Sequence, residues 1–246
     1  GDSQGEILSR TLCLFGIGES AMEAKLREQM LHMENPTLAP YAKEGEVLLR
    51  VTASAGSREE ADRMMEPVIE KVKELFGDNV YGVDIGSLQA ALVAELQKKG
   101  LKAATAESCT GGLVSKRITE VAGASQVFDC GICSYANQIK ERVLGVSHET
   151  LEALGAVSRE TAAQMAAGVR KLAQADIGVS TTGIAGPDGG TDEKPVGLVY
   201  VGVDSENYST VLECRLSRGY RDERELIRYL ASSHALRLAL TAARKA

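Results

Sequence analysis

The sequence lacks any apolar stretch that approaches the ~20 residues a helix needs to cross a bilayer. Its N-terminus also lacks the basic and then apolar pattern of a secretion signal. These two absences predict a cytoplasmic protein that has no membrane partner.

A basic excess is missing as well. The 246 residues include 28 Lys and Arg against 34 Asp and Glu, a formal net charge of −6. Proteins that bind the phosphate backbone of nucleic acids need a clustered basic excess, so we expect no general nucleic-acid binding, although one small anion remains possible. The apolar fraction of 44% is ordinary for a globular protein, and the length suffices for one large or two modest domains.

Cysteine is too sparse and scattered for a disulfide framework. Cys130 and Cys133 form a CxxC pair, but no second pair follows, and the three histidines show no ligand spacing, so no metal site is predicted. The pair lies in an apolar run, which predicts buried structural cysteines within a strand. The five cysteines are Cys13, Cys109, Cys130, Cys133 and Cys214.

Residues 1–85 are predicted to form a small α+β domain with the order β-α-β-α-β. Its first helix is expected to begin at Ser20, with Glu23 completing a capping box, and its second at Ser57, with Glu60 three residues on. No residue in this region indicates chemistry, so a structural or interaction role is expected. The predicted elements are strands 9–18, 46–56 and 80–84 and helices 20–31 and 57–77.

Residues 86–246 alternate between strands and helices, with an apparent hairpin near 197–216 before the last predicted helix. This order predicts an α/β fold, a three-layer α/β/α sandwich on a mixed sheet. The predicted strands are 101–106, 127–135, 177–183, 197–203 and 208–216. The predicted helices are 86–100, 113–122, 137–145, 148–155, 158–175 and 222–245.

The stretch AESCTGGL, residues 106–113, follows a predicted strand and opens a helix. Backbone N–H groups are exposed at such a turn, and those around Thr110, Gly111 and Gly112 could stabilise an oxyanion formed by attack of Ser108. Serine is also a favoured N-cap, and on this stretch alone a cap is the better explanation. Glu107 has no assigned chemistry, but it could hold Ser108 or the loop in place.

Two further stretches carry polar residues at predicted strand ends, where ligands bind in open α/β sheets, and a third lies at the start of a predicted helix. In residues 133–140, a lysine with a pKa lowered by burial could serve as the base for a serine, because no histidine is suitably placed. The long glycine-rich loop 181–197 is predicted to contact a ligand. The arginines at 218–228 suit phosphate recognition or, equally, a salt-bridged helix face.

Four separated motifs then carry a resemblance to a known family. They are AESCTGGLVSKRIT (106–119), SYANQIK (134–140), GAVS (155–158) and TGIAGPDGGTDEKPVGLVYVGV (182–203). In this order they resemble the C-terminal domain of the competence/damage-inducible CinA family, which includes nicotinamide-nucleotide amidohydrolases. The resemblance covers 86–246, and residues 1–85 resemble the family's small KH-like middle domain. It also implies that the family's first domain, a molybdopterin-binding-like module associated with ADP-ribose pyrophosphatase activity, is absent from this sequence.

The resemblance implies hydrolysis of nicotinamide mononucleotide, a small pyridine nucleotide, to nicotinate mononucleotide and ammonia, without metal or organic cofactor. It assigns the nucleophile to Ser108, the base to Lys140 and a supporting role to Tyr135, and it implies a homodimer. One departure is the segment Tyr220–Arg224, where the family's usual glycine and aspartate are replaced, which puts phosphate contacts at 222–223 in doubt. The expected substrate-binding residues are Cys109, Thr110, Gly111, Gly112, Asn137, Thr182, Gly183, Ala185, Gly186, Asp188, Gly189, Gly190 and Arg224.

Two alternatives remain open. Cys109 could be the nucleophile in place of Ser108, because thiolates are activated at helix N-termini. The chain could also be a non-catalytic nucleotide-binding or interaction module in competence or DNA-damage responses, although such a module has no use for the serine, tyrosine and lysine together.

Overall fold

The structure is a computed structural model that describes residues 5–246, with side chains for all of these except residue 31. The chain divides into two compact units, Gly1–Ser87 and Leu88–Ala246, and each unit is described by itself.

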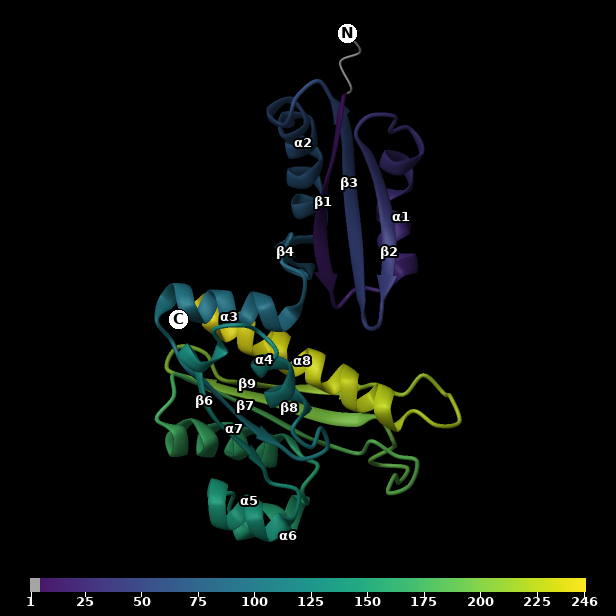
Figure 1. Ribbon diagram of the computed structural model, residues 1–246. Coiled ribbons are helices and arrows are strands. Elements are labelled where there is room, and N and C mark those ends of the chain that lie inside the picture. Colours follow the sequence, from purple (N-terminus) through teal and green to yellow (C-terminus); the bar gives the residue numbers. More distant parts are fainter. Residues whose placement is uncertain (1–4) are drawn as a thin grey trace. The chain divides into compact units, whose positions relative to one another are not determined.

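The first unit is a four-stranded sheet of order β2-β3-β1-β4 covered on one face by two helices (Figure 1). All the pairings are antiparallel. Helix α2 buries residues spaced three or four apart, Met65, Ile69 and Val72 among them, so it packs one apolar face against the sheet. The elements are β1 (Glu6–Phe15), α1 (Glu19–Leu31), β2 (Thr37–Lys43), β3 (Glu46–Ala55), α2 (Arg58–Phe76) and β4 (Val80–Val83).

Strand β2 was not predicted, because Pro40 interrupts its apolar pattern. It is an edge strand, where a residue without an N–H is tolerated. The capping box at Ser20 is also wrong: α1 begins at Glu19, and its N-cap, Gly18, makes no side-chain cap. The second cap is confirmed, since Ser57 Oγ accepts a hydrogen bond of 3.2 Å from the Glu60 N–H.

The second unit is built on a five-stranded mixed sheet of order β6-β5-β7-β8-β9. Strand β5 is parallel to both of its neighbours, whereas β8 and β9 form the antiparallel hairpin. The strands are β5 (Ala103–Glu107), β6 (Phe128–Cys133), β7 (Ile177–Gly183), β8 (Leu198–Ser205) and β9 (Thr210–Arg215). The helices are α3 (Leu88–Lys99), α4 (Leu113–Thr119), α5 (Asn137–Leu144), α6 (His148–Leu154), α7 (Arg159–Ala173) and α8 (Arg224–Lys245).

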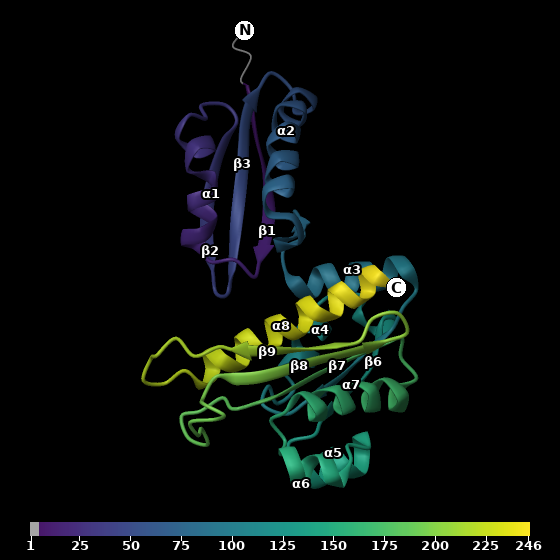
Figure 2. The same ribbon diagram turned by 180° about the vertical axis from the view of Figure 1, so that it is seen from behind.

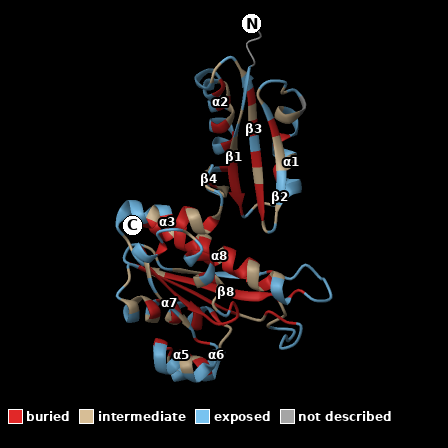
Figure 3. Cartoon of the chain, in the orientation of Figure 1, coloured by how far each residue is buried: buried red, intermediate tan, exposed pale blue. Residues whose placement is uncertain are grey.

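The predicted three-layer α/β/α arrangement is confirmed. Helices α3, α4 and α8 lie on one face of the sheet and α7 on the other, with α5 and α6 beyond α7 (Figures 1 and 2). Burial is densest in the central strands, and every residue of β5 is buried (Figure 3). The sheet is therefore a rigid base from which loops project at its ends.

The prediction of buried cysteines is wrong for the CxxC pair. Strand β6 lies at the edge of the sheet, where Cys133 is exposed and Cys130 half-buried. Residues three apart on a strand point to opposite faces, so these two thiols do not face each other. All five cysteines are free.

No helix within residues 5–246 has the length and apolar character needed to cross a membrane. Within the same range, no three His, Cys, Asp or Glu side chains are grouped so that they could hold a metal ion.

Candidate active site

The loops that follow β5, β6 and β7 meet at one edge of the sheet. Glu107, the last residue of β5, pairs with Cys133 of β6 on one side and Thr181 of β7 on the other. Because the three strands are parallel, their carboxyl ends lie together. A cavity of about 280 Å³ opens there, lined by Ser108, Cys109, Tyr135, Lys140, Ala156, Val157, Thr182, Gly183, Ile184, Ala185, Gly186, Asp188, Gly189 and Arg224.

Lys140 and Ser108 are in direct contact in this cavity. Helix α5 starts just after β6 and turns Lys140 back toward the strand end, where its side chain is fully buried. Its Nζ lies 2.9 Å from Ser108 Oγ, and it donates to the carbonyl oxygens of Ser134 (2.7 Å) and Tyr135 (3.0 Å). The lysine therefore has three polar partners, of which only the serine is a side chain.

The surroundings of Lys140 make its neutral amine more accessible than that of a lysine in water. Burial lowers the pKa of Lys140 to about 8. Among residues 5–246, no carboxylate lies within ion-pair distance of its Nζ. A neutral amine has two N–H groups and one lone pair. With both N–H groups donated to the Ser134 and Tyr135 carbonyls, the lone pair is left for the Ser108 hydroxyl proton.

The turn that carries Ser108 is closed by its own backbone. The Ser108 N–H donates to the Thr181 carbonyl at 2.9 Å, and the Gly111 N–H donates to the Ser108 carbonyl at 3.0 Å. The Gly111 N–H is therefore not available to an oxyanion. The Cys109 N–H, directly after the serine, donates to no other described residue, and Cys109 lines the cavity. The Cys109 N–H is therefore available to a ligand in the cavity.

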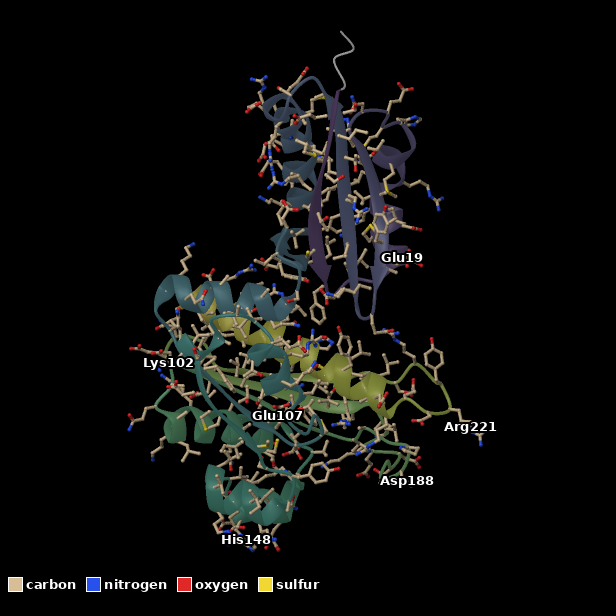
Figure 4. All side chains as sticks on the ribbon, in the orientation of Figure 1. Glu19, Lys102, Glu107, His148, Asp188 and Arg221 are labelled. Atoms are coloured by element: carbon tan, nitrogen blue, oxygen red, sulfur yellow. The ribbon has the colours of Figure 1, made fainter. Side chains whose placement is uncertain are left out.

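Glu107 holds this turn to helix α4. Its buried carboxylate accepts hydrogen bonds from Thr110 Oγ1 (2.6 Å), the Val114 N–H (2.7 Å) and both the N–H (3.0 Å) and Oγ (2.9 Å) of Ser115. Figure 4 labels Glu107 in the interior of the unit. These contacts agree with the holding role that the sequence suggested for Glu107, but its partners Thr110, Val114 and Ser115 could not be named from the sequence, because they come into reach only when the chain turns back over it.

Arg228 holds the turn from the opposite side. From helix α8, its Nε donates to the Cys109 carbonyl at 3.1 Å and its Nη2 to the Thr110 carbonyl at 3.2 Å. The sequence placed this arginine in a basic cluster but did not connect it with the Ser108 turn, which is 119 residues away. Gly111, with a φ of +60°, must also lack a side chain, because a Cβ there would lie 3.0 Å from this guanidinium.

One wall of the cavity, residues 154–157, is fixed through three successive carbonyl groups. The Leu154 carbonyl accepts from Lys194 Nζ at 2.6 Å, that of Gly155 from Thr161 Oγ1 at 2.8 Å and that of Ala156 from Thr182 Oγ1 at 2.7 Å. The donors come from the glycine-rich loop, α7 and β7. Thr182, predicted to bind substrate, thus lines the cavity, but its hydroxyl donates its hydrogen bond to the Ala156 carbonyl of this wall.

Arg224 and Tyr135 close the other side. Arg224 donates to the Gly186 carbonyl through Nη1 at 2.6 Å and to the Tyr135 hydroxyl through Nη2 at 3.3 Å. The Tyr135 side chain is 65% exposed, so its ring is accessible at the mouth. Tyr135 contacts Lys140 through its carbonyl oxygen, whereas its hydroxyl lies at the arginine.

Some predicted residues do not line this cavity. Asn137 and Gly190 are exposed and are not among its lining residues. Thr110, Gly111 and Gly112 line a separate hollow of about 540 Å³, together with Arg228 and other residues of α4 and α8. The remaining predicted binding residues all line the cavity itself. Figure 4 labels Asp188, on the loop after β7, and Arg221, on the loop before α8.

Cys109 is poorly suited to act as the nucleophile. Its side chain is only 6% exposed, and burial raises the pKa of its thiol to about 12, with the Glu107 carboxylate adding to the effect. A thiol with so high a pKa is almost entirely protonated near neutral pH. The structure thus favours Ser108 over its neighbour.

Sequence profiles of two domains match the chain. The CinA C-terminal domain matches residues 85–243, and the KH domain of damage-inducible protein CinA matches residues 9–82. A CinA-like protein of Kosmotoga olearia is 49% identical over 94% of this chain and 55% of its own length. A putative competence-damage inducible protein of Caldanaerobacter subterraneus subsp. tengcongensis is 51% identical over 88% of this chain and 52% of its own length. The chain thus spans about half the length of the curated relatives it matches.

Solved structures agree with these profiles. The competence/damage inducible protein CihA from Agrobacterium tumefaciens is 42% identical, with a TM-score of 0.60 over 63% of this chain and 93% of that protein. A competence or damage-inducible protein from Enterobacter asburiae is 34% identical, with a TM-score of 0.59 over 65% of this chain and 98% of that protein. The profile matches, the identity to relatives and the shared fold lead to one conclusion: the chain belongs to the CinA family.

Proposed function

We propose that the second unit hydrolyses the carboxamide of nicotinamide mononucleotide to nicotinate mononucleotide and ammonia. The observation that carries the proposal is the contact of 2.9 Å between Lys140 Nζ and Ser108 Oγ inside a cavity. A serine with a buried lysine as base is an arrangement for acyl transfer. A carboxamide is an acyl group bonded to an amino group, which leaves as ammonia. The substrate itself is inferred from the resemblance of the four motifs.

In the first step, neutral Lys140 takes the proton of the Ser108 hydroxyl while Oγ attacks the carboxamide carbon. The carbonyl oxygen becomes an oxyanion, which the Cys109 N–H stabilises. One such donor contributes roughly 3–4 kcal/mol to transition-state stabilisation in a serine hydrolase. The new charge on Lys140 is accommodated by the carbonyl oxygens of Ser134 and Tyr135, which already accept from its Nζ.

In the second step, the Lys140 ammonium gives its proton to the amide nitrogen. The C–N bond breaks, ammonia departs, and the acyl group remains as an ester on Ser108. Water then attacks this ester with Lys140 again as the base, and nicotinate mononucleotide is released. Lys140 can donate directly, because it contacts Ser108, whereas the Tyr135 hydroxyl lies at Arg224. Tyr135 therefore supports the base through its carbonyl oxygen.

The rest of the cavity suits the nucleotide part of this substrate. The guanidinium of Arg224 is the cationic group of the lining that remains when Lys140 is neutral, and arginine pairs well with phosphate. The Asp188 carboxylate can accept hydrogen bonds from ribose hydroxyls. Of the lining glycines, Gly189 leaves room for a ligand to approach its backbone, whereas the missing side chains of Gly183 and Gly186 make room for Leu198, Val199 and Val196.

Ammonia release from nicotinamide mononucleotide by the purified chain tests the proposal between pH 6 and 9. We expect release by the wild type and by Lys98→Met, which changes an exposed lysine of α3, and none by Lys140→Met. A folded wild-type chain that binds the nucleotide but releases no ammonia at any of these pH values would instead support the alternative of a non-catalytic binding module.

A further inference from the structure

The cavity holds its base without a counter-ion. Three charged residues line it: Lys140, Asp188 and Arg224. The Asp188 carboxylate makes no ion pair with the lysine, and Arg224 is directed to Gly186 and Tyr135. Lys140 is fully buried, and its Nζ is surrounded by a hydroxyl and two carbonyl oxygens. Its charge state is therefore open to influence from whatever enters the cavity.

The ring of the proposed substrate must lie close to this amine. Ser108 Oγ is 2.9 Å from Nζ, and it has to approach the carboxamide carbon, which is bonded to the ring. In the proposed substrate, ribose on the ring nitrogen makes the ring a permanent cation. Like charges disfavour one another, and two unit charges about 6 Å apart in partly hydrated protein shift a pKa by roughly 1–2 units.

We propose that binding of the permanently cationic ring of the substrate expels the proton from Lys140 into solvent. The inference rests on the proposed function and adds to it a linkage between the charge of the bound ring and the protonation of the base. Lys140 therefore becomes neutral, and able to accept the Ser108 proton, when the substrate that Ser108 attacks is bound. The accessible ring of Tyr135 and the carboxylate of Asp188 are the groups that can face the cation.

No other titratable group around Lys140 is placed to take over this role. The Glu107 carboxylate is occupied by four donors at the start of α4, and the Cys109 thiol stays protonated. Arg228 points to the carbonyl oxygens of the turn. The charged side chains of α5 and of the adjacent helices α6 and α7 are exposed or paired elsewhere. Glu141 and Glu152 pair with His148, Arg159 with the Val211 carbonyl and Arg170 with Asp204. The exposed ones are Arg142, Glu149, Glu160 and Lys171.

Binding and proton release are linked in both directions. If the cationic ring lowers the proton affinity of Lys140, protonation of Lys140 must weaken binding of the ring by the same factor. The dissociation constant should then rise as the pH falls below about 8, by about 10- to 100-fold in total for a pKa shift of 1–2 units, and level off below the shifted pKa. A neutral ring of the same shape should show no such dependence from this lysine.

The test is titration calorimetry of Ser108→Ala, which cannot turn the substrate over, at pH 7.5 in buffers of different ionisation enthalpy. The ligands are nicotinamide mononucleotide and its analogue in which a neutral benzamide ring replaces the nicotinamide ring. Both carry the same phosphate, so phosphate protonation contributes equally. We expect proton release only with the cationic ligand, and its loss in the double variant Ser108→Ala/Lys140→Met. Equal release with both ligands, or release with neither, would overturn the inference.

A second measurement on the wild-type enzyme avoids the variants. The acid limb of kcat/KM reports the free enzyme and that of kcat the complex. We expect the kcat limb about one pH unit or more below the kcat/KM limb, and coincident limbs would contradict the inference. Absence of ammonia release would instead refute the proposed hydrolysis, while the calorimetric result would still report on the charge of Lys140.

Discussion

Lys140 Nζ and Ser108 Oγ lie 2.9 Å apart, although 32 residues separate them in the chain. The contact arises because β5 and β6 are parallel neighbours and each is followed directly by a turn into a helix. One turn presents the serine, and α5 brings the lysine back to it. The pair is thus a consequence of strand order.

Replacement of the two adjacent candidates separates the nucleophile from its neighbour. Ser108→Ala is expected to lower kcat at least 10³-fold, because no oxygen remains to form the ester. Cys109→Ala should keep kcat within about tenfold, since the proposed contribution of Cys109 is its backbone N–H. Ammonia release under saturating substrate measures both. The reverse result, an active Ser108→Ala and an inactive Cys109→Ala, would assign the reaction to the thiol.

The activity should rise with pH through the pKa of Lys140. The active form is the neutral amine, so kcat/KM is expected to increase up to about pH 8 and then level off. Lys140→Arg should be inactive across the whole range, because a guanidinium does not lose its proton in proteins. A wild-type profile that is flat from pH 6 to 9 would show that Lys140 does not act as the base.

Stability offers an independent measure of the same pKa. The folded-state pKa of Lys140 is lowered from its ordinary value of 10.5 to about 8. Between these two values the unfolded chain binds more protons than the folded one, so folding becomes more favourable as the pH rises through this window. Relative to Lys140→Met, the free energy of unfolding of the wild type should gain roughly 3 kcal/mol from below pH 8 to above pH 10.5. Urea titrations of both proteins measure the gain, and a pH-independent difference would contradict it.

Glu107→Gln should destabilise the second unit. The variant loses the charge that accepts four hydrogen bonds, and its amide nitrogen meets donors that it cannot satisfy. We expect a loss of about 2–3 kcal/mol together with lower activity, because the Ser108 turn loses its anchor. Glu120→Gln, at an exposed pair with Lys116, serves as the control and should change stability by less than about 1 kcal/mol. Equal thermal unfolding curves for the two variants would argue against the anchor.

Lys194→Met should loosen the wall at 154–157. It removes the donor to the Leu154 carbonyl and leaves those of Thr161 and Thr182 in place. The expected result is a KM raised about tenfold with kcat nearly unchanged, since the chemical groups are untouched and only binding is affected. Lys194→Arg, which can still donate, should restore most of the affinity, and Lys98→Met should have no effect. A loss of kcat at constant KM would place Lys194 in the chemistry instead.

The elements of the second unit could be read from local patterns. Strand β5 is a short apolar run that ends in AESCTGG, and the serines that cap α6 and α7 accept hydrogen bonds from the N–H groups of Thr150 and Thr161. Such signals act within a few residues, so they do not depend on the rest of the fold. Strand β2 shows the limit: its pairing with β3 overrides Pro40 only because β2 lies at an edge of the sheet.

The amino-acid sequence alone determined which residues could carry chemistry: the serine after a strand, the lysine in a short helix and the glycine-rich loop. Only the tertiary structure decided how they work. Glu107 and Arg228 hold the serine's turn from opposite sides, Thr182 supports a wall, and Asn137 lies outside the cavity. Burial also acts differently on two groups of the site, since it raises the pKa of the Cys109 thiol, which stays protonated, and lowers the pKa of Lys140 toward neutrality. Side-chain contacts and desolvation depend on which distant segments come together, and no local pattern records that.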